Sequence, residues 1–244
     1  MLKWWVGLDA MSRRGGQARK FPGIRVLIFD LDGTLIDSSQ DLAAAVNMAR
    51  GHMGLPPLSL AQVMTFIGNG ARELVRRGIS FDTGSVSDAA IDRALGYFRE
   101  HYSRHLLDQT RPYPGVREAL EFFSQQPATR APRTLAVLTN KPLRFTRPIL
   151  EGLGLAPCFR YIYGEDSFPT KKPDPAGALS ILRDAGAAPH EAMLIGDSEI
   201  DVQTARNAGT WACGVTYGLG SARLADCPPD MLLDSLAELP ACLD

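Results

Sequence analysis

The stretch Val26-Leu27-Ile28-Phe29-Asp30-Leu31-Asp32-Gly33-Thr34 decides the fold of this chain. Its first four residues are all apolar, which is typical of a strand buried on both faces of a parallel sheet. Asp30 and Asp32 follow directly, and in an extended backbone side chains two residues apart share one face. Gly33 then allows the backbone to turn sharply. The stretch therefore predicts a pair of acids at the carboxyl end of a buried strand.

Further apolar runs alternate with helical patterns along the rest of the chain. We expect strands at 134–138, 161–163, 192–195, 211–215 and, more weakly, 231–233. We expect the helices between them at 114–125, 145–152, 175–185 and 200–207. This alternation predicts an α/β fold, a doubly wound parallel sheet with helices on both faces and right-handed crossovers.

One long segment interrupts the alternation with helical periodicity alone. Helices are expected there at 39–53, 59–67, 71–77 and 87–108. We therefore predict a core formed by 23–37 and 111–244, and an inserted all-helical cap at 38–110. A cap that follows the first strand lies over the carboxyl end of the sheet, where ligands usually bind. Residues 1–22 are expected to be a disordered N-terminal extension.

Composition and charge exclude several function classes. The 26 basic and 27 acidic residues nearly cancel, so the chain has no basic field for nucleic acid or an anionic membrane. No apolar run approaches the roughly 20 residues that span a bilayer. The four cysteines lie far apart in sequence, which favours reduced thiols. We expect a cytoplasmic monomer or homodimer that acts on a small molecule.

Polar clusters follow the other predicted strands as well. Thr139 and Asn140 follow the second strand, Lys172 lies in the loop after the third, and Asp197 and Asp201 follow the fourth. The carboxyl ends of parallel strands meet at one edge, so these residues can share one site. Clustered carboxylates repel unless a cation joins them or a pKa rises. Oxygen ligands without histidine or cysteine favour Mg²⁺.

The residues alone suggest a division of chemical labour. One of the two neighbouring carboxylates could attack as a nucleophile while the other handles the proton of the leaving group. A lysine would hold the negative charge of a phosphate. Each cluster by itself is also compatible with a turn, a strand exit or a solvated loop. The order of the clusters, each at a strand end, favours the functional interpretation.

The ordered set resembles the four motifs of the haloacid dehalogenase superfamily. The motifs here are Phe29 to Leu35, Leu138-Thr139-Asn140, Lys172-Pro173 and Gly196 to Asp201, and the resemblance runs from about Ile24 to the C-terminus. It implies that Asp30 attacks phosphorus to form an aspartyl-phosphate. Asp32 would protonate the leaving oxygen and then activate the hydrolytic water. Dehalogenases of this superfamily lack the second acid, so Asp32 favours the phosphoryl-transfer branch.

The resemblance implies roles for the remaining clusters too. Thr139, Asn140 and Lys172 would bind the phosphate. Mg²⁺ would be held by the carboxylates of Asp30 and Asp197 and by the backbone carbonyl of Asp32, while Asp201 would orient waters or Lys172. The helical insert is similar to the C1-type cap of the superfamily.

Several stretches resemble bacterial phosphoglycolate phosphatases, notably Phe66 to Ala71, Ala136 to Pro142 and Gly164 to Pro173. This implies 2-phosphoglycolate as the substrate. Asn69, at a helix N-terminus, and Arg72 would then contact the substrate carboxylate through a backbone N–H group and the guanidinium. The alternative is a turn between helices with a solvated arginine.

Other functions remain open at this point. A phosphosugar mutase would use the same aspartyl-phosphate but needs a second phosphate site in the cap, where only Arg72, Arg76 and Arg77 cluster. A phosphatase for a sugar phosphate, pyrophosphate or a nucleotide would share the core motifs. A non-enzymatic binding protein is disfavoured, because Asp30, Asp32, Lys172 and Asp197 are all present.

Overall fold

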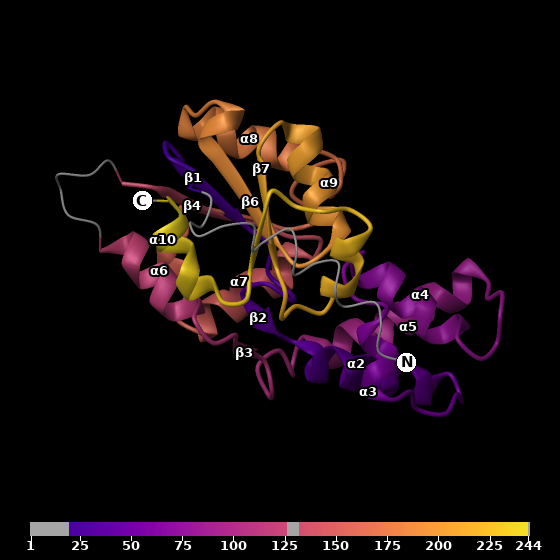
Figure 1. The fold of residues 1–244 in the computed structure, drawn as a ribbon. Coiled ribbons are helices and arrows are strands. Elements are labelled where there is room, and N and C mark those ends of the chain that lie inside the picture. The colour runs from indigo at the N-terminus through magenta and orange to yellow at the C-terminus, as the bar shows by residue number, and fades with distance from the viewer. Residues whose placement is uncertain (1–19, 126–131, 244) are drawn as a thin grey trace, which may run out of the picture.

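The structure, a computed structural model, describes residues 20–125 and 132–243. Its centre is a six-stranded parallel sheet with the strand order β5-β4-β1-β6-β7-β8 (Figure 1). The strands are β1 (Val26–Phe29), β4 (Thr134–Leu138), β5 (Tyr161–Tyr163), β6 (Ala192–Gly196), β7 (Trp211–Val215) and β8 (Met231–Leu233). The chain adds strands first on one side of β1 and then on the other. The predicted doubly wound sheet is therefore confirmed.

Helices cover both faces of this sheet, because successive residues of a strand point to opposite faces. Val26 and Ile28 pack in one apolar cluster with α8 (Ala176–Ala185) and α9 (Glu199–Ala208). Leu27 and Phe29 pack in the opposite cluster, with α6 (Val116–Ser124), α7 (Leu143–Gly152) and α10 (Leu239–Leu243). Figure 1 shows these two helical layers on either side of the strands. The continuous apolar run of β1 is thus buried from both sides.

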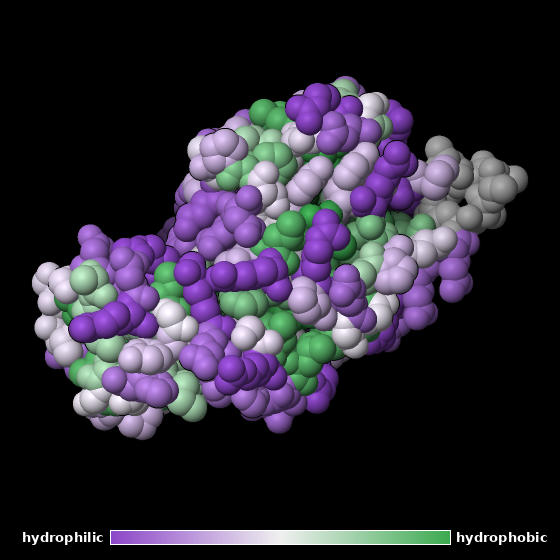
Figure 2. Space-filling view, turned by 180° about the vertical axis from the view of Figure 1, so that it is seen from behind, coloured by the Kyte–Doolittle hydropathy of each residue, from purple (hydrophilic) through white to green (hydrophobic). Residues whose placement is uncertain are grey.

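Four further helices form the insert, which we call the cap. They are α2 (Ser39–His52), α3 (Leu60–Met64), α4 (Ala71–Ser80) and α5 (Asp88–Tyr102). Their apolar faces make a cluster of their own, which also takes in Phe145 from α7. Figure 1 shows the cap at one end of the sheet, and Figure 2 shows a mixture of hydrophilic and hydrophobic areas across both bodies. Phe145 therefore packs the core directly against the cap.

Some elements differ from the sequence predictions. The two connections to the cap pair as a short antiparallel ribbon, β2 (Ile36–Asp37) with β3 (Arg111–Pro112), which is too short to leave a pattern in the sequence. The last cap helix ends at residue 102, not 108. The prediction was too long because Leu106 and Leu107 continue the apolar pattern, but these two residues lie beyond the helix and pack against the core. The helix α10 was not predicted, and neither were the 3₁₀ turns Ala156–Cys158, Pro189–Glu191, Ser221–Ala225 and Leu236–Glu238.

The carboxylate of Asp41, in the first turn of α2, fastens the base of the cap. It accepts hydrogen bonds from the backbone N–H groups of Gln109, at 3.0 Å, and Thr110, at 2.9 Å. The Thr110 hydroxyl donates a further one at 2.7 Å. Since Asp41 is buried, these bonds join the entering and leaving connections of the cap in a solvent-poor place.

The N-terminal part of the described chain is joined to the core. Phe21 is buried, its backbone N–H donates to the carbonyl of Cys242 at 2.9 Å, and its ring lies 5.2 Å from that of Trp211. The core packing thus includes a residue that the sequence assigned to the extension. Residues 1–19 of the predicted extension lie outside the described residues. Among the described residues, no helix is long and apolar enough to cross a membrane.

The buried side chain of Arg50 ties together three parts of the cap. Its Nε donates to the carbonyl of Pro56 at 2.7 Å, Nη1 donates to the carbonyl of Gly78, and Nη2 pairs with Asp82. We expect Arg50→Met to lower the free energy of unfolding by about 2–4 kcal/mol, because it strands buried carbonyls without a donor. Urea unfolding measures this. The exposed Arg93→Met on α5 should cost less than about 0.5 kcal/mol, and equal losses would contradict the role of Arg50.

Candidate active site

The site residues predicted from the four core motifs meet at the carboxyl edge of the sheet, next to β1. Phe29, the last residue of β1, pairs with Val137 of β4 and with Ile195 of β6. The backbone N–H of Asp30 still donates to the carbonyl of Ile195, at 2.9 Å. Asp30 therefore lies where the strand order reverses, the place at which open α/β sheets bind their ligands.

Lys172, from the loop between β5 and α8, lies between two carboxylates. Its Nζ is 2.9 Å from Oδ1 of Asp30 and 2.6 Å from Oδ1 of Asp201. All three side chains are buried. The second oxygen of Asp201 accepts from the backbone N–H of Ser198 at 3.1 Å and from its hydroxyl at 2.8 Å. Asp201 thus holds Lys172 in place and is itself held by the start of α9.

Burial and neighbouring charge shift the pKa values of this group. Burial raises the pKa of Asp30 from 3.8 to about 6, although the nearby Lys172 ammonium acts in the opposite direction. Burial would lower the pKa of Lys172, but Asp201 and Asp30 more than compensate, so its pKa is raised. Lys172 consequently stays charged and offers a permanent cation beside Asp30.

Three carboxylates converge where a cation could bind. One oxygen from each of Asp30, Asp197 and Asp201 lies within 4.8 Å of the others. Burial raises the pKa of Asp197 well above its ordinary value, and the charges of Asp201 and Asp30 add to this. Such mutual repulsion falls when a cation joins the group.

The donor atoms of this cluster suit a hard divalent cation. Oδ1 of Asp30 is buried and receives no well-aligned hydrogen bond, although Lys172 is near. Oδ2 of Asp197 accepts one from the backbone N–H of Gly220, at 2.7 Å. Gly33 has a φ of 89° and passes so close to the Asp197 carboxylate that a Cβ would clash with it. Buried carboxylate oxygens without nitrogen or sulfur ligands fit Mg²⁺.

Asp32 is held by two residues that were not predicted as site residues. Nζ of Lys141 lies 2.9 and 3.0 Å from its two carboxylate oxygens, and the Ser38 hydroxyl donates to Oδ1 at 2.5 Å. Burial would lower the pKa of Lys141, but the charge of Asp32 and the nearby Tyr102 outweigh it, so the pKa is raised. Lys141 follows Thr139-Asn140 directly, and this adjacency was the available signal in the sequence.

Thr139 and Asn140 shape the loop after β4. The Thr139 hydroxyl accepts from the backbone N–H of Lys141 at 3.2 Å. Nδ2 of Asn140 donates to the carbonyls of Lys172, at 3.0 Å, and of Gly68, at 3.2 Å. Asn140 therefore connects the loop after β4 to the Lys172 loop and to the cap.

The two predicted cap residues lie differently from each other. The Arg72 guanidinium pairs with Asp92 and, at 3.1 Å, with Asp88 of α5, and half of its side chain is exposed. It does not line the pocket formed by the described residues. The backbone carbonyl of Asn69 accepts from Nζ of Lys171 at 2.8 Å, which adds a second contact between cap and core.

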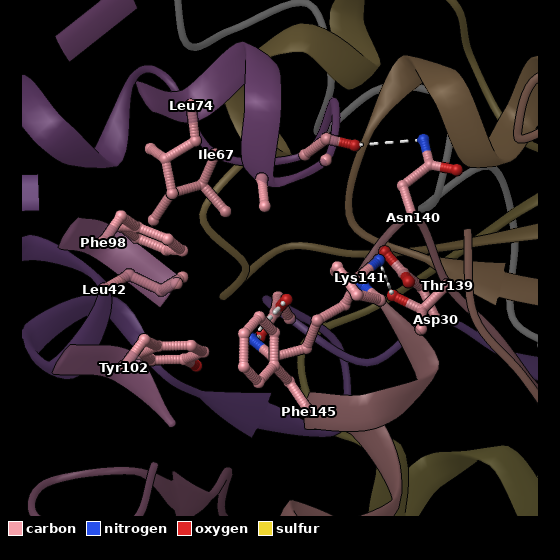
Figure 3. A pocket seen from close by; sticks show the side chains of 15 residues that line it. Asp30, Leu42, Ile67, Leu74, Phe98, Tyr102, Thr139, Asn140, Lys141 and Phe145 are labelled. Atoms are coloured by element: carbon pink, nitrogen blue, oxygen red, sulfur yellow. Dashed lines mark hydrogen bonds and ion pairs between the residues drawn. The ribbon is translucent and has the colours of Figure 1, made fainter. Parts of the chain in front are cut away.

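A pocket that is partly open to solvent lies between cap and core. Figure 3 shows its two contrasting walls. The core side presents polar groups, and the cap side presents mostly apolar ones. The polar wall contains Asp30, Asp32, Thr139, Asn140 and Lys141, and the opposite wall contains Leu42, Ile67, Leu74, Phe98 and Tyr102. The pocket thus has a polar, charged wall from the core opposite a mostly apolar wall from the cap.

The fold and the four clusters define a class of protein. A carboxylate at the switch point of the sheet, a buried lysine beside it and an acidic group from the next strand lie together as the four predicted motifs lead one to expect. The family model described as "Haloacid dehalogenase-like hydrolase" matches residues 27–215. The chain belongs to this family.

Particular relatives are similar over nearly the whole chain. The phosphoglycolate phosphatase of Pseudomonas putida is 42% identical over 236 residues, covering 94% of this chain and 84% of that protein. Phosphoglycolate phosphatase 1 of Pseudomonas aeruginosa is 39% identical, covering 90% and 80%. The crystal structure of a predicted phosphoglycolate phosphatase from Haemophilus somnus superimposes with a TM-score of 0.84 at 33% identity, covering 90% of this chain and 97% of that one.

Proposed function

We propose that this chain is a Mg²⁺-dependent phosphatase that hydrolyses 2-phosphoglycolate to glycolate and phosphate. The observation that carries the proposal is the buried Asp30, paired with Lys172 at the floor of a small pocket and next to Asp32. Similarity to the Pseudomonas enzymes supports the substrate. That the protein acts in the cytoplasm, as a monomer or homodimer, stays a prediction.

In the proposed reaction an oxygen of Asp30 attacks phosphorus, and the bond between phosphorus and the ester oxygen breaks. The form of Asp32 that carries a proton gives it to that oxygen, so glycolate leaves and an aspartyl-phosphate remains. Asp32 then takes a proton from water, and the resulting hydroxide displaces Asp30 from phosphorus. Phosphate leaves, and both carboxyl groups return to their starting state.

The surrounding groups would hold the phosphate during both steps. Lys172 and the Thr139 hydroxyl would donate to its oxygens, which become more negative in the transition state, and Asn140 would give nearby support. Asp30, Asp197 and the carbonyl of Asp32 would hold Mg²⁺, and Asp201 would position Lys172. When bound, the ion supplies positive charge that neutralises the phosphoryl oxygens and the clustered carboxylates.

The charge distribution of the cap favours a phosphatase over a mutase. A mutase needs a second phosphate site, yet the three arginines considered for it are already paired. Arg72 contacts Asp88 and Asp92, while Arg76 and Arg77 both contact Glu73. Among the described cap residues, none that lines the pocket is a lysine or arginine.

Initial rates of phosphate release on a substrate panel test the proposal. The panel contains 2-phosphoglycolate, a sugar phosphate, pyrophosphate and a nucleotide, each with Mg²⁺ and with EDTA. We expect the highest kcat/KM for 2-phosphoglycolate and loss of turnover in EDTA. Isomerised sugar phosphate in place of free phosphate would establish a mutase instead.

A variant at Asp197 tests the metal site separately. We expect Mg²⁺ at 100 times its Kd to stabilise the wild type by about 2.7 kcal/mol, because the folded state binds the ion. Asp197→Asn should lose most of this gain in thermal unfolding experiments. Asp184→Asn, on the exposed side of α8, is the matched control and should keep it. Equal stabilisation of all three proteins would place the ion elsewhere.

A further inference from the structure

Two polar groups of the pocket have no part in the mechanism above. One is the ammonium of Lys141, on the core side, and the other is the hydroxyl of Tyr102, at the end of α5 in the cap. Figure 3 shows the two side chains converging from opposite walls. Both groups can therefore contact a part of the substrate other than its phosphate.

Lys141 is a buried cation with room beside it. Its Nζ contacts both oxygens of Asp32 and lies 4.8 Å from the centre of the Tyr102 ring. An ammonium has three protons to donate, and the two contacts with Asp32 leave one of them for a further anionic acceptor. Nζ is therefore a donor that faces the cavity from directly beside the proposed acid.

Tyr102 is fully buried, and its hydroxyl, which lies close to the Lys141 ammonium, makes no hydrogen bond of good geometry among the described residues. A buried polar atom without a partner is costly, and a bound ligand commonly supplies what is missing. Burial raises the pKa of Tyr102 to about 12, so the hydroxyl keeps its proton at neutral pH. The Tyr102 hydroxyl can therefore donate a hydrogen bond to an acceptor on a bound ligand.

We propose that Lys141 and Tyr102 together bind the carboxylate of the substrate and so determine its specificity. This inference rests on the proposed function. It transfers the role that the sequence suggested for Arg72 to two buried residues, one from each wall of the pocket. A carboxylate between them would satisfy the Tyr102 hydroxyl and bridge the core to the cap.

The small number of bonds between the ester oxygen and the carboxylate of the substrate supports this assignment. In 2-phosphoglycolate only two bonds separate the ester oxygen from the carboxylate carbon. If Asp32 protonates that oxygen, then Lys141, which contacts Asp32 at 2.9 Å, is a near neighbour of the group two bonds away. The charged end of a longer substrate, such as a sugar bisphosphate, would extend beyond this pair.

The other walls add selectivity against polyhydroxylated substrates. Leu42, Ile67, Leu74, Phe98 and Phe145 surround the same space and offer no donors or acceptors from their side chains. A sugar would leave hydroxyl groups unpaired against these walls, which is costly. A two-carbon carboxylate leaves none.

Selectivity between matched esters tests the inference. Ethyl phosphate carries a methyl group where 2-phosphoglycolate carries its carboxylate, so the ratio of kcat/KM for 2-phosphoglycolate to kcat/KM for ethyl phosphate reports recognition of the carboxylate. We expect Tyr102→Phe to lower this ratio about 10-fold and Lys141→Gln about 100-fold, the range for a hydrogen bond to a charged group. Tyr97→Phe, also on α5 but stacked on His52 outside the pocket, should keep the ratio within about twofold.

Replacing Lys141 could also change the rate through its contact with Asp32, the proposed acid. A binding measurement avoids this effect because no reaction takes place. 3-Phosphonopropionate has a methylene in place of the ester oxygen and cannot be hydrolysed, and propylphosphonate is its counterpart with a methyl group in place of the carboxylate. Titration calorimetry in Mg²⁺ should show the carboxylate-bearing ligand binding more tightly to the wild type. In both variants this advantage should shrink by the same factors as the kinetic ratio.

The outcomes separate the two levels of the proposal. A wild type that prefers 2-phosphoglycolate, with both variants keeping the full preference in rate and binding, overturns the assignment of Lys141 and Tyr102 but leaves the proposed function intact. A wild type without any preference for the carboxylate overturns the proposed substrate, and the inference falls with it. Loss of preference in the variants alone supports both.

Discussion

Replacing Asp30 with asparagine is expected to lower kcat for phosphate release at least ~10³-fold, the scale for removing an essential nucleophile. The amide has nearly the shape of the carboxylate but cannot form the aspartyl-phosphate. The substitution would also remove the ion pair in which Lys172 lies 2.9 Å from Oδ1 of Asp30. Initial rates with saturating Mg²⁺ and 2-phosphoglycolate measure the effect.

The control for this prediction is Asp184→Asn, which changes the same chemical group on the surface of α8. Its rate should match that of the wild type, and thermal unfolding should show that the Asp30 variant is folded. Rapid quenching followed by intact-mass measurement should detect a phosphorylated wild type and no such species in Asp30→Asn. Retention of more than about a tenth of the wild-type rate would rule out Asp30 as the nucleophile.

Replacing Lys172 with methionine is expected to affect stability and catalysis together. The change leaves Asp30, Asp197 and Asp201 buried without the cation that two of them contact. Removing one partner of a buried ion pair typically costs about 3–5 kcal/mol. We therefore expect a loss of that size in urea unfolding without Mg²⁺, and a smaller loss in saturating Mg²⁺, because the ion also neutralises the carboxylates. The rate should fall by about 10²–10³, as for other lost transition-state donors.

The neighbouring lysine provides the control. Nζ of Lys171 donates to the carbonyl of Asn69 and its side chain is 45% exposed, so Lys171→Met should cost less than about 1 kcal/mol with or without Mg²⁺. A Lys172 variant that lost as little as this, or whose loss did not respond to Mg²⁺, would separate Lys172 from the carboxylate cluster.

The fold could be predicted from the sequence because its signals are local. The run 26–29 is apolar at every position, and this pattern arises where both faces of a strand are buried. The same kind of run marks β4 and β6, so a parallel sheet with right-handed crossovers could be expected from simple rules, whereas the strand order came from the structure. The ribbon of β2 and β3 was not predicted, because two residues per strand are too few to show a periodic pattern.

The candidate site divides in the same way. Asp30, Thr139, Lys172 and Asp197 each follow a strand, so their convergence could be expected from topology alone. Tyr102 could not be found like this, because it lies on a helix whose apolar face reads as ordinary core. For Arg72 the sequence suggested a substrate contact, but whether an exposed arginine meets a ligand or an acid on the next helix depends on helix packing.

The sequence by itself determined the sheet, the helical insert and the family, because burial patterns and strand-end motifs are formed by residues that are close together in the sequence. Only the tertiary structure decided which groups of the cap face the reaction centre. The rotation of α4 and α5 about their axes turns Arg72 toward Asp88 and Asp92 and leaves Tyr102 over Lys141. That rotation follows from the packing of four helices at once, and such a many-body fit has no signature in any single stretch of the chain.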